Sequence, residues 1–161
     1  MTETPRPVRI AVLTVSDTRT LVSDTGGGTI VARLSEAGHE VVDRVILPDE
    51  PDQIEAKVAA YVANAEVDVV LLTGGTGVSS RDRTFEAIER LITHKLPGFG
   101  ELFRMLSYGQ IGPHSMISRA TAGVRNRVAI FAMPGAPAAV ELALDKLIVP
   151  TLGHIVWLLT R

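Results

Sequence analysis

The sequence predicts an α/β fold built around a mostly parallel β-sheet. Short apolar runs, rich in β-branched residues, alternate along the chain with longer segments whose apolar residues recur at helical spacing. The first run, VRIAVLTV at residues 8–15, is typical of a strand that is covered on both faces. This alternation of strands and amphipathic helices favours a parallel sheet with helical connections.

Length and composition indicate a single folded domain. The chain has 161 residues, of which 46% are hydrophobic and 21% charged. It is long enough for one domain with a substantial core and too short for two of ordinary size. We assign residues 8–161 to that domain and expect the proline-containing residues 1–7 to be flexible.

The composition also argues against several classes of function. A net charge of −2 gives no basic surface for nucleic acid. The absence of cysteine excludes disulfides and thiolate chemistry, and the scattered histidines lack the spacing of a zinc site. No apolar run reaches the roughly 20 residues of a membrane span, and the polar start shows no secretory signal, so we expect a cytoplasmic protein without a membrane partner.

The N-terminal half contains three predicted strands and two helices. The strands are VRIAVLTV at 8–15, VVDRVIL at 41–47 and VDVVLLT at 67–73. The first helix carries an apolar stripe up to Ala37, where Gly38 suits a helix C-terminus. The second begins at Pro51, because proline is favoured in the first turn of a helix.

The C-terminal half contains one further predicted strand and several helices. Apolar residues at 85, 88, 91 and 92 predict a helix after the third strand, and another helix is expected from Glu101 to Tyr108. RVAIFAM at 127–133 is the fourth strand. Apolar positions 140, 144 and 147 predict the next helix, and residues 155–159 form a last apolar element.

Polar and glycine residues follow each predicted strand. They are Ser16 and Asp17 after the first strand, Asp49 after the second, Gly74 to Gly77 and Asp82 after the third, and Pro134 and Gly135 after the fourth. In a parallel sheet all strands end at one edge, where ligands bind. We therefore expect these loops to form one rim.

The glycine loop and the acidic residues together predict a phosphate ligand with Mg²⁺. Glycine lets the backbone approach an anion closely, and the N-terminus of the following helix adds a partial positive charge. Asp49 and Asp82 would repel a phosphate unless a divalent cation lay between them. No lysine follows Gly77, so the loop lacks the motif of P-loop ATPases.

Structural alternatives remain open for the same residues. The loop from Gly74 to Gly77 could be a tight turn without a ligand. Asp49 and Asp82 could be helix N-caps, since each precedes a helical stripe, and Ser16 and Asp17 could be turn residues. The functional interpretation depends on several such loops meeting at one edge.

Several segments together resemble a known family. TGGTG at 73–77, followed by RDRT at 81–84, resembles the signature of the molybdopterin adenylyltransferases, the MogA/MoaB group of molybdenum cofactor biosynthesis. Further segments resemble those of the family in the same order: LTVSDTR at 13–19, LPDE at 47–50, PGFGELFR at 97–104, SRATAGVR at 118–125 and FAMPGAP at 131–137. The resemblance covers essentially the whole chain after Val8, and the full set is highly specific.

The resemblance implies a fold, a reaction and partners. The fold is a three-layer α/β sandwich around a mostly parallel sheet, assembled as a homotrimer. The reaction transfers AMP from Mg-ATP to the terminal phosphate of molybdopterin and releases pyrophosphate. The product then passes to a protein that inserts molybdate. Such a reaction needs positioning and charge neutralisation more than covalent catalysis.

The resemblance also implies residue roles. Asp82 and Asp49 match the two essential acids, which would hold Mg²⁺ on the ATP phosphates; some relatives in the MoaB branch lack them and are regarded as inactive. The remaining implied roles are phosphate binding by Gly74, Gly75, Thr76 and Gly77, contact with the nucleotide or its metal by Ser16 and Asp17, shaping of the nucleotide pocket by Pro134 and Gly135, and pterin-side binding by Glu101, Ser118 and Arg119.

For the pterin-side residues a structural interpretation is equally open. Arg119 could pair with a phosphate or form a structural salt bridge. Glu101 could form a surface pair with Arg104 instead of binding a ligand.

Two other functions also fit the sequence. One is a molybdopterin-binding carrier or docking protein without transferase activity, which would not need the two acids. The other is a regulatory or hydrolytic nucleotide-binding domain.

Overall fold

The computed structural model describes residues 6–161, so the flexible segment predicted over residues 1–7 lies largely outside the described residues. The strands are β1 (Arg9–Val15), β2 (Glu40–Leu47), β3 (Val69–Thr73), β4 (His94–Lys95), β5 (Thr121–Arg125) and β6 (Val128–Met133). The helices are α1 (Thr25–Glu36), α2 (Pro51–Ala63), α3 (Thr84–Glu89), α4 (Pro97–Ile111), α5 (Pro137–Ala143) and α6 (Val149–Thr160).

The six strands form one sheet in the order β2-β1-β3-β6-β5-β4. The four strands predicted from sequence, β1, β2, β3 and β6, run parallel to one another. The mostly parallel α/β sheet is therefore confirmed. β4 and β5, which the sequence analysis did not predict, extend the sheet by antiparallel pairing beside β6.

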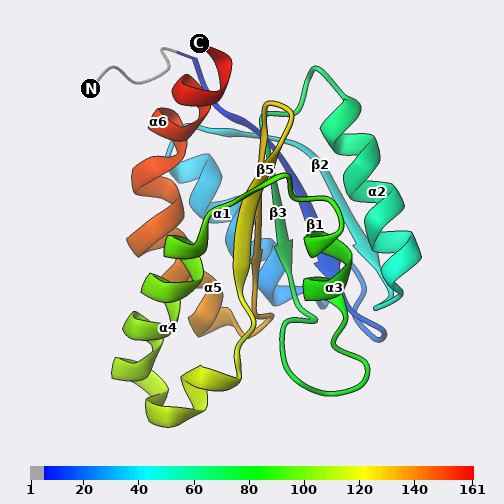
Figure 1. Ribbon diagram of the computed structural model, residues 1–161, viewed down its shortest axis with the longest axis vertical. Coiled ribbons are helices and arrows are strands. Elements are labelled where there is room, and N and C mark those ends of the chain that lie inside the picture. Colours follow the sequence, from blue (N-terminus) through cyan, green and yellow to red (C-terminus); the bar gives the residue numbers. More distant parts are fainter. Residues whose placement is uncertain (1–5) are drawn as a thin grey trace.

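The helices cover both faces of the sheet, so the fold has three layers (Figure 1). Alternate side chains of β1 point to opposite sides: Ile10 and Val12 pack with α1, α4, α5 and α6, whereas Ala11 and Leu13 pack with α2 and α3. Each face thus has its own apolar core, which explains why the central strands are apolar along nearly their whole length.

Two predicted helices have different bounds in the structure. α4 begins at Pro97 and continues to Ile111, beyond the predicted range of 101–108 on both sides. α3 ends at Glu89, and the apolar residues Leu91 and Ile92 follow it in a turn that leads into β4. Both residues still pack against the α2–α3 core, so the apolar spacing indicated burial correctly but not helix length.

The last two elements predicted from the sequence, the helix around residues 140–147 and the apolar element at 155–159, belong to one helical segment in the structure. A π-helical turn, Leu144–Ile148, joins α5 to α6, and the combined segment Pro137–Thr160 is long and apolar enough by composition to cross a membrane. Its buried side chains at Val140, Leu144, Ile148, Leu152 and Val156 recur every four residues and pack against the sheet. This is the arrangement of a core helix.

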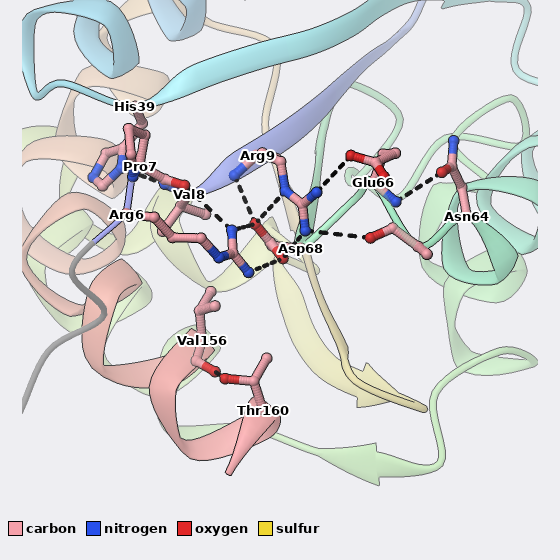
Figure 2. Close-up of polar contacts among 11 residues, drawn as sticks. Arg6, Pro7, Val8, Arg9, His39, Asn64, Glu66, Asp68, Val156 and Thr160 are labelled. Carbon is pink, nitrogen blue, oxygen red and sulfur yellow. Dashed lines mark hydrogen bonds and ion pairs between the residues drawn. The ribbon is translucent and has the colours of Figure 1, made fainter.

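An ion-pair network joins the starts of β1 and β3, at the end of the sheet away from the glycine loop (Figure 2). Arg6 makes two hydrogen bonds to the carboxylate of Asp68, at 2.7 and 2.9 Å. The backbone N–H of Arg9 also donates to Asp68, at 2.8 Å. The buried carboxylate therefore holds both the backbone and the side chains at the start of the first strand.

Candidate active site

The C-terminal ends of the parallel strands bring the predicted loops together. Thr14 of β1 lies opposite Thr73 of β3, which in turn lies opposite Met133 of β6. The N–H of Gly74 donates to the carbonyl of Met133 at 2.9 Å, and that of Ser16 donates to Leu47 O at 2.9 Å. The loops after β1, β2, β3 and β6 thus form one rim.

The glycine loop has a backbone conformation that its sequence requires. Gly74 and Gly75 have φ values of 98° and 70°, in the left-handed region that favours glycine. A Cβ on Gly75 would lie only 2.6 Å from Oδ2 of Asp49. The absence of a side chain at this position lets the carboxylate approach the loop.

Asp49 is a buried acid with a raised pKa. The residue is 6% exposed; its Oδ1 accepts from the N–H of Arg83 at 3.1 Å, and its own N–H donates to Asp17 at 3.0 Å. Burial raises the pKa of the Asp49 carboxyl, and the charges of Asp82 and Asp17 add to the effect. The side chain makes no capping bond to α2, which excludes the N-cap alternative for Asp49.

Asp82 lies against the other end of the glycine loop. Its Oδ2 accepts from the N–H of Ser79 at 2.9 Å, and a Cβ on Gly77 would lie 2.7 Å from the same oxygen. The cap residue of α3 is Arg83, without a side-chain capping bond, so Asp82 does not cap that helix either. The two carboxylates therefore contact the loop itself.

The donor set suits a metal ion only if a ligand contributes to the coordination. Within residues 6–161, no three acidic or histidine side chains are grouped to hold a metal unaided. Two carboxylates beside a glycine loop do fit Mg²⁺, which keeps water and substrate phosphates as its other ligands.

The side chains of Ser16 and Asp17 bond to other residues of the protein. Ser16 Oγ accepts from the N–H of Thr18 and of Arg19, as expected of a turn residue. Asp17 forms an ion pair with Arg81 at 3.0 Å, and Arg81 also contacts Glu50 at 3.1 Å. The hydrogen bond from Arg81, followed by that from Asp49 N–H, lowers the pKa of Asp17.

The predicted binding residues lie in three separate pockets, two of which are lined in part by the glycine loop. One of about 240 Å³ is lined by Ser16, Thr25, Gly74 and Gly135. A second of about 370 Å³ is lined by Glu101, Ser118 and Arg119, together with Lys95 and Arg104. A third of about 300 Å³ is mostly apolar and is lined by Thr76, Gly77, Phe103, Ile111 and Pro134. The predicted nucleotide-side residues Pro134 and Gly135 therefore line different pockets.

The side chains of Arg119 and Arg104 bond mainly to other groups of the protein. Arg119 forms an ion pair with Glu86 at 2.9 Å, which is the structural salt bridge left open by the sequence. Arg104 donates to the carbonyls of Ser118 and Ala120, at 3.1 and 2.9 Å, and not to Glu101. The proposed surface pair between Glu101 and Arg104 is thus not formed, and Glu101 is an exposed residue at the mouth of the pocket.

Comparison with known proteins gives the family. The model of a probable molybdopterin-binding domain matches residues 11–154. The chain belongs to this family. This probable molybdopterin-binding domain is 49% identical to molybdenum cofactor biosynthesis protein B of Bacillus subtilis, over 96% of this chain and 91% of that protein.

Solved structures agree with the assignment. The domain superposes on a crystal structure of molybdenum cofactor biosynthesis protein B with a TM-score of 0.95, at 46% identity and 99% coverage of both chains. It also superposes on the tungsten cofactor synthesizing protein MoaB from Pyrococcus furiosus, with a TM-score of 0.87, at 33% identity over 98% of this chain and 100% of that one. The predicted MogA/MoaB-type fold is confirmed.

Sequence reasoning missed two residues that shape the site of this molybdopterin-binding domain. Thr84 donates its hydroxyl to Gly74 O at 2.9 Å and its N–H to Gly75 O at 3.0 Å, which closes the glycine loop. Arg81 connects three loops of the rim through Asp17 and Glu50. Both residues lie in the RDRT segment, so their place beside Asp82 in the motif was the available signal.

Proposed function

We propose that this domain is a molybdopterin adenylyltransferase of molybdenum cofactor biosynthesis. It would transfer AMP from Mg-ATP to the terminal phosphate of molybdopterin and release pyrophosphate. Family membership and the names of the relatives support the pterin substrate and the pathway. The observation that carries the catalytic part is the contact of two carboxylates, Asp49 and Asp82, with the glycine loop.

Asp49 and Asp82 would hold Mg²⁺ on the phosphates of ATP. The metal would neutralise charge on the phosphates and on the two acids together. Burial and the charges of neighbouring acids make ionisation of Asp49 less favourable than that of an exposed carboxyl. A divalent cation would remove that cost, which is why we favour a metal role over a structural one for this residue.

The reaction needs an in-line approach of two phosphates. An oxygen of the terminal molybdopterin phosphate would form a bond to the α-phosphorus of ATP, and the bond from that phosphorus to the bridging oxygen would break. Pyrophosphate would leave with the electron pair of the broken bond. Gly74, Gly75, Thr76 and Gly77 would orient the phosphates through backbone N–H groups.

Different pockets near the rim would take the two substrates. Ser16, Pro134 and Gly135, which line two of these pockets, would contact the nucleotide or its metal, as would Asp17 beside Ser16. The pterin would enter the pocket of Glu101, Ser118 and Arg119, and the shared lining of these three residues supports this assignment.

Assembly and location complete the proposal. We expect a cytoplasmic homotrimer that passes its product to a molybdate-insertion protein. The outer side of α4 exposes Leu102, Met105 and Tyr108, which suits a contact between subunits.

A turnover assay with isosteric variants tests the proposal. Purified protein, molybdopterin and Mg-ATP are combined, and pyrophosphate and adenylylated pterin are measured together. Asp82→Asn and Asp49→Asn should each lower kcat by about 100-fold or more, because each removes a charge that is needed at the reacting phosphates. Asp52→Asn is the matched control, since that carboxylate is fully exposed on α2.

The alternatives predict different results. A carrier would bind molybdopterin without turnover in any variant. A nucleotide-hydrolysing domain would release phosphate or pyrophosphate from ATP without requiring the pterin.

A further inference from the structure

The guanidinium of Arg119 is bonded to the two ends of the loop that carries Asp82. Its Nε donates to the carbonyl of Gly77 at 2.8 Å, and its Nη2 donates to the carbonyl of Asp82 at 2.7 Å. The backbone N–H of Arg119 also donates to Thr76 O at 2.7 Å. One residue therefore closes the base of the loop from residue 77 to residue 82.

Apart from Arg81, which pairs with Asp17 and Glu50, the loop has little other support. Val78 is 67% exposed, and the next three residues are also exposed. The bonds inside the loop link only Ser79 with Asp82 and Arg81. The position of the loop relative to the rest of the rim thus depends on the ion pairs of Arg81 and on the bonds at its two ends.

Helix α3 fixes the orientation of the Arg119 side chain. Glu86 accepts from both terminal nitrogens of the guanidinium, at 2.9 and 3.1 Å. The guanidinium carbon also lies 5.3 Å from the ring centre of Phe85. A bidentate pair of this kind sets the plane of the guanidinium as well as its position.

We infer that Arg119 is a positioning residue that holds Asp82 at the reacting phosphates through the backbone of its loop. These bonds use four of the five guanidinium N–H groups, so only one Nη1–H is left for a direct bond to a phosphate. This inference rests on the proposed transferase function for its catalytic consequence. The closure of the loop is independent of that function.

Two variants separate this role from phosphate binding. Glu86→Gln removes the carboxylate that orients Arg119 but leaves the guanidinium charge. Arg119→Lys keeps a positive charge but cannot bridge two carbonyls with a rigid fork. If Arg119 is a positioning residue, both changes should loosen the loop and lower kcat about 10- to 100-fold, with KM for molybdopterin within about twofold.

The loop is measured directly by limited trypsin digestion of the ligand-free protein. Cleavage after Arg81, identified by mass spectrometry, should be about tenfold faster in both variants than in the parent protein, because cleavage needs an open loop. Glu55→Gln is the matched control: it removes the same charge from α2, where Glu55 pairs with the exposed Arg90 at 3.2 Å. Its cleavage rate and kcat should not change.

Other results would overturn the inference. Cleavage at the parent rate in both variants would show that Arg119 does not hold the loop. A tenfold rise in KM for Arg119→Lys, with KM unchanged in Glu86→Gln, would instead make Arg119 a phosphate ligand. If the parent protein shows no turnover, the proposed function fails, while the cleavage rates still decide whether Arg119 closes the loop.

Discussion

At the scale of single residues, the site depends on two close approaches between glycine and carboxylate. Asp49 lies where a side chain on Gly75 would be, and Asp82 lies where a side chain on Gly77 would be. Gly75 also needs its left-handed φ of 70°. The glycines therefore position the acids as well as the backbone N–H groups.

Substitution of Gly75 tests this dependence. Gly75→Ala should lower the free energy of unfolding by about 1–3 kcal/mol, because it adds backbone strain and a clash with Asp49 and Thr84. Urea denaturation measures the change. Gly98→Ala is the control: a Cβ there meets nothing within 4 Å in helix α4, so its stability should stay the same or rise by up to about 1 kcal/mol. Equal stability of the two variants would contradict the argument.

The sequence showed which residues follow each strand, but not what those residues bond to. Asp49 and Asp82 could be placed on the rim because parallel strands end at one edge. The sequence left open that these two acids cap helices. Only the structure excluded this alternative, since capping depends on local backbone geometry. The partners of Arg119 come from residues that are distant in sequence, so pattern and spacing could not predict them.

At the scale of elements, the strands that were missed differ from those that were predicted. β5 reads TAGVR, with small and polar residues, and β4 has only two residues, so neither forms an apolar run. A Cβ on Gly123 would meet the side chain of Ile92 and, at 2.8 Å, the carbonyl of His94. Glycine permits the close pairing of β4 with β5, and tertiary contacts override a weak strand signal.

Gly123→Val should therefore disrupt this edge of the sheet despite the high strand propensity of valine. We expect a loss of about 2–4 kcal/mol in unfolding free energy, because the added atoms overlap Ile92 and the β4 backbone. Chemical denaturation gives the value, and hydrogen exchange of residues 93–96 locates the change. Thr121→Val, at a half-buried position of the same strand, should change stability by less than about 1 kcal/mol. A neutral Gly123→Val would show that β4 adapts freely.

At the scale of the whole molecule, the two ends of the sheet carry different electrostatics. At the rim, burial and neighbouring acids raise the pKa of Asp49. At the opposite end, burial of Asp68 is outweighed by hydrogen bonds from Arg6 and Arg9, which lower its pKa to about 2 (Figure 2). The surroundings of Asp49 therefore disfavour its charged form, whereas those of Asp68 favour the charged form.

The Asp68 network gives a defined pH dependence. Its pKa in the folded protein lies below the unfolded value of about 3.9, so its contribution is complete above that pH and is lost as pH falls toward 2. Asp68→Asn should lower the unfolding free energy by about 1–3 kcal/mol at pH 7. The difference from the parent protein should shrink between pH 4 and pH 2, as measured by urea denaturation at each pH. A difference that is constant over this range would contradict the assignment.

Arg81 links three loops of the rim through ion pairs. It lies beside Asp82 in the sequence, and its guanidinium holds Asp17 after β1 and Glu50 after β2. A phosphate that attracted Arg81 would free two carboxylates at the moment when a cation arrives with the nucleotide. Substrate entry, metal affinity and loop order would then change together, so the rim would respond to its ligand as one unit.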